Sequence, residues 1–184
     1  MSDQVALIGV VVVPLLGALA VMLAGSRPNL REAMSLGAGV VLLALVVRLL
    51  PRVLSGDWPA TVLAEPIPGL ALAFSAEPLG VLFGLIASFL WIVTTVYSIG
   101  YMRGHGEAHQ TRFYAFFAIA MGCTMGVAFA DNLFTLFVFY ELLTLSTYPL
   151  VTHAGTREAR QGGRTYLGIL MATSMGFLLL AVVW

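Results

Sequence analysis

Residues 135–153, TLFVFYELLTLSTYPLVTH, place one carboxylate, that of Glu141, in the middle of an otherwise apolar stretch. A charged acid at the centre of a bilayer costs about 2.5 kcal/mol or more. The cost falls if the group keeps its proton or ionises against a nearby cation, and a group that alternates between these states can carry a proton. The alternative is structural, because a lone glutamate can hydrogen-bond between helices and hold a bundle together.

Polar side chains continue from Glu141 along one line of the predicted helix. Thr144, Tyr148 and Thr152 follow it by three, seven and eleven residues, and His153 comes next. With ordered water, such a line could carry protons between Glu141 and the solvent, with His153 at the mouth because histidine titrates near neutral pH. Each hydroxyl could instead bond to backbone one turn back, and His153 could be a solvated loop residue.

The remaining candidate groups predict structure rather than chemistry. Asp131 precedes the same segment, and its carboxylate is expected to cap the helix, with a role in ion transfer as the alternative. Cys123, the only cysteine, falls in an apolar segment and is expected to be a buried, inert thiol. His105 and His109 belong to a polar loop with no further ligand nearby, so we expect no metal. The chain has no cysteine cluster for iron–sulfur and no histidine pair inside an apolar segment for haem, so we expect no cofactor.

The composition indicates an integral membrane protein. Hydrophobic residues make up 60% of the 184 and charged residues 10%, whereas soluble domains are roughly 25% charged. The predicted fold class is all-α, with the lipid bilayer as its solvent. Six segments are long and apolar enough to span a membrane: 5–24, 33–54, 78–101, 113–130, 132–152 and 165–184. The net charge is zero, and no basic tract suggests nucleic acid.

The basic residues predict the orientation of these spans. All nine are arginines, and the chain contains no lysine. The loops after the first, third and fifth spans carry seven of them, whereas only two lie near the opposite side, at Arg48 and Arg52. Because cytoplasmic loops are enriched in basic residues, the first set is expected to be cytoplasmic. Both termini of this multi-pass protein would then be external to a bacterial-type cytoplasmic (inner) membrane.

Residues 55–77 form the one sizeable external segment. Prolines at 59, 66 and 68 prevent a continuous helix. The flanking TVLA and LALAF could pair as a short hairpin on the membrane face, and a plain loop is the alternative. We divide the chain into residues 1–77, with two spans and this segment, and 78–184, with the other four.

From about residue 74 onward, the chain resembles a known family. SIGYMRG (98–104), RFYAFF (112–117) and DNLFTLFVFYELLTLSTYPLV (131–151) are similar to the antiporter-like subunits of respiratory complex I and of Mrp-type cation/proton antiporters, with the D-like branch of the Mrp group most similar. The resemblance implies the front part of a fold of about fourteen helices containing two inverted five-helix repeats. It also implies proton movement, sometimes coupled to sodium, within a multi-subunit complex.

In this family, the glutamate of the fifth helix pairs with a lysine of the seventh, which is discontinuous. The resemblance assigns the glutamate role, that of proton carrier, to Glu141. The sequence ends at Trp184, after the sixth span, and has no lysine. We therefore expect the cation to come from another membrane subunit or from the missing C-terminal half.

Two functions of different class remain open at this point. The first is a proton-translocating subunit, with sodium as a candidate coupled ion, that is active only with such a partner. The second is a structural membrane subunit that docks a redox or carbon-uptake module and transports nothing. We do not expect this chain to be an enzyme by itself, although it could belong to an ion-translocating oxidoreductase or antiporter complex.

Overall fold

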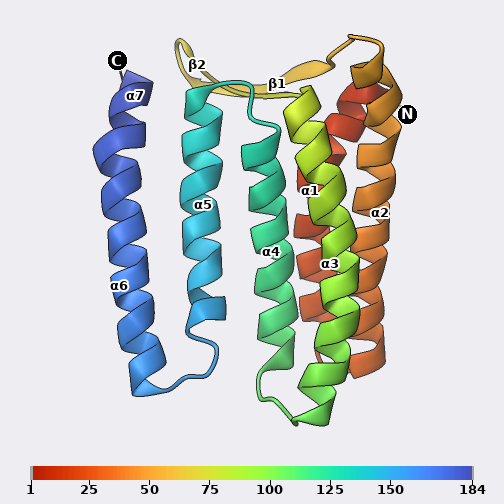
Figure 1. Cartoon of the computed structure of the whole chain (residues 1–184), viewed down its shortest axis with the longest axis vertical. Helices are drawn as coiled ribbons and strands as arrows, with labels where there is room; N and C mark the ends of the chain where they lie inside the picture. The colour runs from red at the N-terminus through yellow and green to blue at the C-terminus, as the bar shows by residue number, and fades with distance from the viewer. Residues whose placement is uncertain (1, 184) are drawn as a thin grey trace.

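The computed structural model describes residues 2–183 and consists mainly of long, nearly parallel or antiparallel helices (Figure 1). They are α1 (Asp3–Leu23), α2 (Pro28–Leu54), α3 (Pro78–Gly104), α4 (Gln110–Ala128), α5 (Leu133–Val151) and α6 (Arg157–Thr173); α6 continues through a π-helical turn, η1 (Ser174–Leu178), into α7 (Leu179–Val183). Counting α6 to α7 as one, six helices are long and apolar enough to cross a membrane. The predicted all-α membrane fold with six spans is confirmed.

The helices begin earlier than several of the predicted apolar segments. Pro28 and Pro78 occupy the first positions of α2 and α3, where a proline loses no helical hydrogen bond. Thr156 caps α6 by accepting a bond from Ala159 N at 3.1 Å. The first turns of α6 carry polar and charged residues, so hydropathy alone placed its start at residue 165 instead of 157.

The first four helices form the packed part of the molecule. Large side chains such as Leu7, Leu42 and Trp91 are almost fully buried between them. Small residues let the helices approach closely: a Cβ on Gly17 of α1 would meet Ala38 of α2 at 2.6 Å. Within a bilayer this tight packing, rather than exclusion of water, is what favours association of helices.

Packing becomes looser toward the end of the chain. Helix α5 contacts α4 through Phe139, whose ring occupies the space that a side chain on Gly126 would need. Helix α6 stands at the edge of the row (Figure 1), and only 6% of its apolar span is buried by the rest of the chain. The outer face of α6 is therefore open to lipid or to another polypeptide.

Residues 55–77 contain the hairpin that the sequence left open. Strand β1 (Ala60–Ile67) pairs antiparallel with β2 (Leu70–Ser75), with register irregularities after Val62 and Ala64. Gly69 in the turn has φ +85°, a conformation that glycine adopts without strain. The hairpin lies across one end of the helices, near the beginning of α1 and the end of α7 (Figure 1). We call this end the hairpin face.

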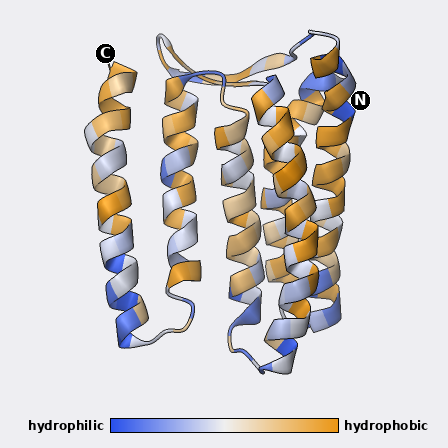
Figure 2. Cartoon of the chain, in the orientation of Figure 1, coloured by the Kyte–Doolittle hydropathy of each residue, from blue (hydrophilic) through white to orange (hydrophobic). Residues whose placement is uncertain are grey.

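The opposite end carries the short turns between α1 and α2, α3 and α4, and α5 and α6. Polar residues gather at this end, and the middle of the helix row is largely apolar (Figure 2). Seven of the nine arginines lie at or next to these turns: Arg27, Arg31, Arg103, Arg112, Arg157, Arg160 and Arg164. We call this end the arginine-rich face.

Candidate functional site

Helix α5 positions Glu141 between the two ends of the molecule. Its N-terminus is capped by Asn132, whose Oδ1 accepts a bond from Thr135 N at 2.8 Å. Glu141 lies eight residues after Leu133 and ten before Val151, or about 12 and 15 Å along the helix. The predicted cap was therefore wrong: Asp131 is exposed and precedes the helix by two residues, whereas Asn132 has the extended backbone of a capping residue.

Both carboxylate oxygens of Glu141 are shielded from solvent and have no hydrogen-bond partner within residues 2–183. The ion pairs in this part of the chain all involve other acids, namely Asp3, Glu32 and Asp57. A buried carboxylate without any partner is costly when charged. Residues 2–183 therefore supply no counter-charge and no hydrogen bond for the Glu141 carboxylate.

Residues near the end of α5 meet the first half of α6. Tyr148 and Thr152 lie against Gly163, where an added Cβ would be 3.2 Å from the Tyr148 ring. The hydroxyl of Thr147 lies 3.2 Å from that of Tyr166 on α6. The structure thus brings two of the predicted path residues, Tyr148 and Thr152, to a contact between helices.

Hydroxyl groups on α5 also bond to the helix backbone, which is the alternative to a proton path that the sequence left open. Thr152 donates to the carbonyl oxygen of Tyr148 at 2.9 Å, one turn back. Thr144 is 3% exposed, and its carbonyl oxygen accepts a bond from the Thr147 hydroxyl at 3.0 Å. The proton path through these residues stays a prediction.

His153 is half-buried at the arginine-rich face. Its backbone carbonyl accepts a bond from Arg112 Nη2 at 3.0 Å, and its ring contacts the edge of Phe113 with centroids 5.7 Å apart. Burial, followed by the positive charge of Arg112, lowers the pKa of His153 below its usual value. His153 is therefore not a freely solvated loop histidine, and near neutral pH it favours the uncharged form.

Tyr140, next to Glu141, borders cavities on two sides of α5. One cavity of about 260 Å³ is lined by Tyr140 with Thr173, Ser174, Phe177 and Leu178 of the α6–α7 segment. Another, of about 430 Å³, lies toward α3 and α4. In the sequence Tyr140 is one aromatic residue among many, and only the packing of α5 distinguishes it.

The first of these cavities adjoins the π-helical turn. The hydroxyls of Thr173 and Ser174 donate to the carbonyl oxygen of Leu170 at 2.8 and 3.0 Å. Hydroxyls bonded in this way compete with the regular helical ladder, and π-turns often occur at functional sites. The helix across from Tyr140 is thus irregular where the cavity lies.

A second buried charged group was not predicted from the sequence. Glu32 of α2 is 4% exposed and pairs with Arg31 at 3.3 Å and with Arg103 of α3. Gln110 and Thr111 of α4 accept further bonds from Arg31 at 2.8 and 3.2 Å. The signal in the sequence is an acid adjoining an arginine at a span boundary, which looks the same as the loop charges that set orientation.

Among residues 2–183, no three histidine, cysteine, aspartate or glutamate side chains lie close enough together to hold a metal ion. Cys123 is buried in α4, as its apolar surroundings predicted.

No protein-family model matches the chain, but individual proteins do. The Na(+)/H(+) antiporter subunit A1 of Staphylococcus aureus (strain bovine RF122 / ET3-1) is 28% identical over 121 residues, which cover 65% of this chain and 15% of that subunit. A second subunit A1 of Staphylococcus aureus is 28% identical over 125 residues, covering 67% and 15%. The chain therefore spans about 15% of the length of these curated relatives.

The fold is similar to part of a solved structure, that of the membrane-bound sulfane sulfur reductase, an archaeal respiratory membrane complex. The TM-score is 0.76 at 16% sequence identity, and the match covers 97% of this chain and 27% of that chain. At this identity, the similarity concerns the fold alone.

The similarity to the A1 subunits confirms the resemblance to antiporter-like membrane subunits that the motifs indicated. The relatives named above are A1 subunits of Na(+)/H(+) antiporters. The more particular resemblance to the D-like branch of the Mrp group stays a prediction.

Proposed function

We propose that this chain is a proton-translocating membrane subunit in which Glu141 binds and releases the transported proton. The observation that carries the proposal is the shielded, unpartnered carboxyl group near the middle of α5. In the proposed cycle Glu141 holds the proton until a cation comes close, because a nearby positive charge favours the ionised form of a carboxyl group. Alternation between the two states moves one proton per cycle.

The cation is supplied from outside these six spans. No lysine occurs in the sequence, and the arginines lie at or near the helix ends. We propose that another membrane subunit, or a further segment of a longer protein, places an intramembrane lysine beside Glu141, as the family resemblance implies. Approach of the lysine releases the proton from Glu141, and its withdrawal lets the proton return.

Protons reach Glu141 from the arginine-rich face, which we propose is cytoplasmic in a bacterial inner membrane. His153 forms the mouth of this path, followed by Thr152, Tyr148 and Thr144. Contact of Tyr148 and Thr152 with α6 supports a path along this helix boundary. The names of the A1 relatives make sodium the candidate ion moving in the opposite direction.

The first test replaces Glu141 by glutamine, which keeps the shape of the side chain but binds no transported proton. The intact assembly is reconstituted in vesicles, and proton movement is followed with a pH-sensitive dye. We expect the Glu141→Gln assembly to form normally and to move no protons above the background of empty vesicles.

Glu158→Gln is the matched control, because Glu158 is an exposed acid in the first turn of α6. This control should pump at the rate of the unmodified assembly. Normal pumping by Glu141→Gln would contradict the assignment of the proton to Glu141.

The second candidate function is a structural subunit that holds other membrane subunits together. It is favoured by the outward face of α6, where Gly168 and Gly176 have no atom within 4 Å of an added Cβ, leaving room for a close helix. Under this function Glu141→Leu should raise the thermal midpoint of the assembly, because it removes an unpartnered buried polar group. Proton movement should then be unchanged by the substitution.

A further inference from the structure

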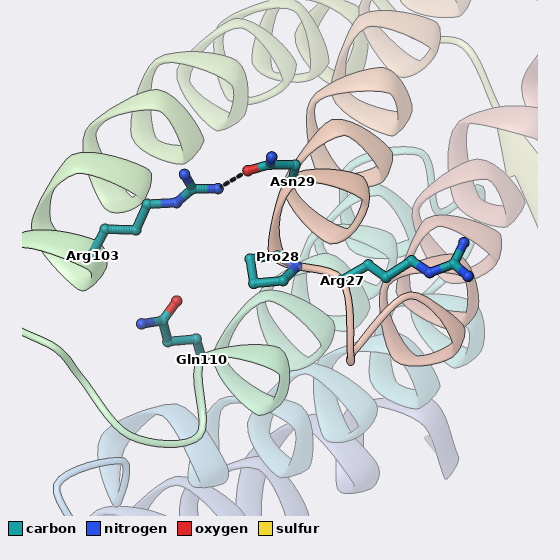
Figure 3. A pocket seen from close by; sticks show the side chains of 5 residues that line it. All are labelled: Arg27, Pro28, Asn29, Arg103 and Gln110. Atoms are coloured by element: carbon teal, nitrogen blue, oxygen red, sulfur yellow. Dashed lines mark hydrogen bonds between the residues drawn. The ribbon is translucent and has the colours of Figure 1, made fainter.

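A cavity of about 520 Å³ opens at the arginine-rich face, where α2, α3 and α4 meet. It is lined by Arg27, Pro28, Asn29, Arg103 and Gln110 (Figure 3). In this view Arg103 and Asn29 point toward one another across the cavity, Gln110 lies below them, and the side chain of Arg27 extends away beyond Pro28. The cavity is distant along the chain from Glu141 and does not depend on the function proposed above.

The charges around this cavity do not cancel. Arg31 and Arg103 share a single carboxylate, that of Glu32. Arg27 adds a third guanidinium, and it makes no ion pair within residues 2–183. Three positive charges against one negative leave an excess of two at the edge of an apolar bundle, where solvent screens charge less than in bulk water.

Several donors around the cavity are still available. Arg103 uses Nε and Nη2 for Glu32, and Nη2 also bonds to Asn29 Oδ1 at 2.6 Å. No bond within residues 2–183 involves Arg103 Nη1, and the Arg103 side chain is 45% exposed. Deeper in, Arg31 Nε is buried without a hydrogen-bond partner. Guanidinium groups in such a setting favour phosphate oxygens, which accept several donors at once.

Apolar surface lies directly on the bilayer side of the cavity. Val96 stands seven residues before Arg103 on the same face of α3 and is 58% exposed. Val40 stands eleven residues after Asn29 on the same face of α2 and is 54% exposed. On α3, Gly100 lies between Val96 and Arg103 and leaves open space where another residue would have a side chain. An acyl chain could follow this surface while its headgroup occupied the cavity.

Aromatic rings mark the same level as a membrane interface. Tyr97 stacks on Tyr101 with ring centroids 6.1 Å apart, and Tyr101 stacks on His105 at 4.3 Å. Tyrosines are enriched where the headgroups of a bilayer meet its hydrocarbon. The cavity beside Arg103 is therefore at the depth of lipid phosphates.

We propose that this cavity binds the phosphate headgroup of an anionic phospholipid, with Arg103 and Asn29 as its ligands and the acyl chains against Val40 and Val96. The positive charge of Arg27 adds attraction from the rim of the cavity. Basic pockets between membrane helices bind anionic lipid headgroups, because opposite charges attract at the membrane surface. The lipid neutralises one of the two excess positive charges around Glu32 and ties the ends of α2 and α3 together.

The test uses the protein purified from its native membrane with the subunits that accompany it, and then delipidated. Phosphatidylglycerol, phosphatidylcholine and inorganic phosphate are added in turn, and bound lipid is counted by native mass spectrometry. We expect one phosphatidylglycerol per chain to bind at a roughly tenfold lower concentration than phosphatidylcholine. The choline cation of phosphatidylcholine offsets the attraction of its phosphate to the arginines, and each such attraction is worth about 1 kcal/mol. Inorganic phosphate should not displace it.

Variants assign the lipid to this cavity. Arg27→Gln and Asn29→Ala should each weaken phosphatidylglycerol binding, and Arg103→Gln should abolish it. If Arg103→Gln fails to fold, the Arg27→Gln/Asn29→Ala double variant decides, because it leaves the Glu32 ion pairs in place. Arg160→Gln, an exposed arginine at the same end of the molecule, is the matched control and should bind lipid normally.

Four results would overturn the proposal. Equal binding of phosphatidylglycerol and phosphatidylcholine would show that the cavity does not distinguish lipids by their net charge. Displacement of phosphatidylglycerol by inorganic phosphate would show that the cavity binds free anions. Equal weakening by Arg160→Gln would show diffuse attraction to the whole face. An acidic segment of another subunit seated in the cavity would replace the lipid altogether.

Discussion

Glu141 and Glu32 are both buried, but they differ in the cations beside them. Glu32 is paired with Arg31 and Arg103, so removing its carboxylate would leave the buried guanidinium of Arg31 without a counter-charge, which is strongly destabilising. Glu141 has no partner within residues 2–183, so its protonation can respond to a cation that moves. The same side chain is thus suited to a stable link between helices in one place and to proton exchange in the other.

His153 provides a pH-dependent test at the scale of a single residue. Its pKa is lowered in the folded chain by burial and by Arg112, whereas in the unfolded chain it is about 6.5. As the pH falls below about 6.5, the unfolded chain binds the proton first, so the folded state loses stability. Above that pH both states are uncharged and the effect vanishes.

We therefore expect the thermal midpoint of the detergent-solubilised protein to fall between about pH 6.5 and pH 5. His153→Gln should reduce this fall, whereas His105→Gln, a change at an exposed residue ending α3, should preserve it. An identical pH profile for the unmodified protein and His153→Gln would contradict the buried, uncharged histidine.

At the scale of elements, Asn132 links α5 to the hairpin. Its side-chain oxygen caps the helix, and its Nδ2 donates to the carbonyl oxygen of Ala71 at 2.9 Å. Thr135 on the next turn accepts a bond from Ala73 N at 2.9 Å. The hairpin is therefore held against the end of the helix that carries Glu141.

Asn132→Ala should destabilise the protein by about 1 to 3 kcal/mol, since it removes a cap and a second, partly buried hydrogen bond. The loss should appear as a lower thermal midpoint and as faster hydrogen exchange of the β2 amides. Asp131→Ala changes the neighbouring exposed residue and should leave both measurements unchanged. A larger effect from Asp131→Ala would restore the cap predicted from the sequence.

The sequence predicted the elements well where hydropathy alone determines their position. It predicted them less well where side-chain geometry determines where a helix begins or becomes irregular. The six spans and the position of Glu141 follow from apolar length. The choice of Asn132 over Asp131 depends on one residue of helix register, and the π-turn at Ser174 depends on hydroxyl rotamers. The Glu32 cluster was missed because arginines at span ends look alike, whether they face solvent or another helix.

At the scale of the whole molecule, the hairpin and arginine-rich faces predict the topology. Val62 on the hairpin is 64% exposed and Ala154 in the turn before α6 is also exposed, while the native Cys123 is buried. In right-side-out vesicles, a membrane-impermeant thiol reagent should label Val62→Cys but not Ala154→Cys. The unmodified protein, with Cys123 alone, is the control and should remain unlabelled; the reverse pattern would place the arginine-rich face outside.

The proposed proton exchange at Glu141 requires a positive group beside its carboxylate, and none pairs with it among residues 2–183. The most direct measurement is the distance from the Glu141 carboxylate to the nearest lysine or arginine nitrogen in a high-resolution map of the intact assembly. We predict a lysine from another subunit or segment within about 4 Å, or joined to Glu141 through one ordered water. A Glu141 carboxyl facing lipid, with neither a cation nor water beside it, would contradict proton exchange at this residue.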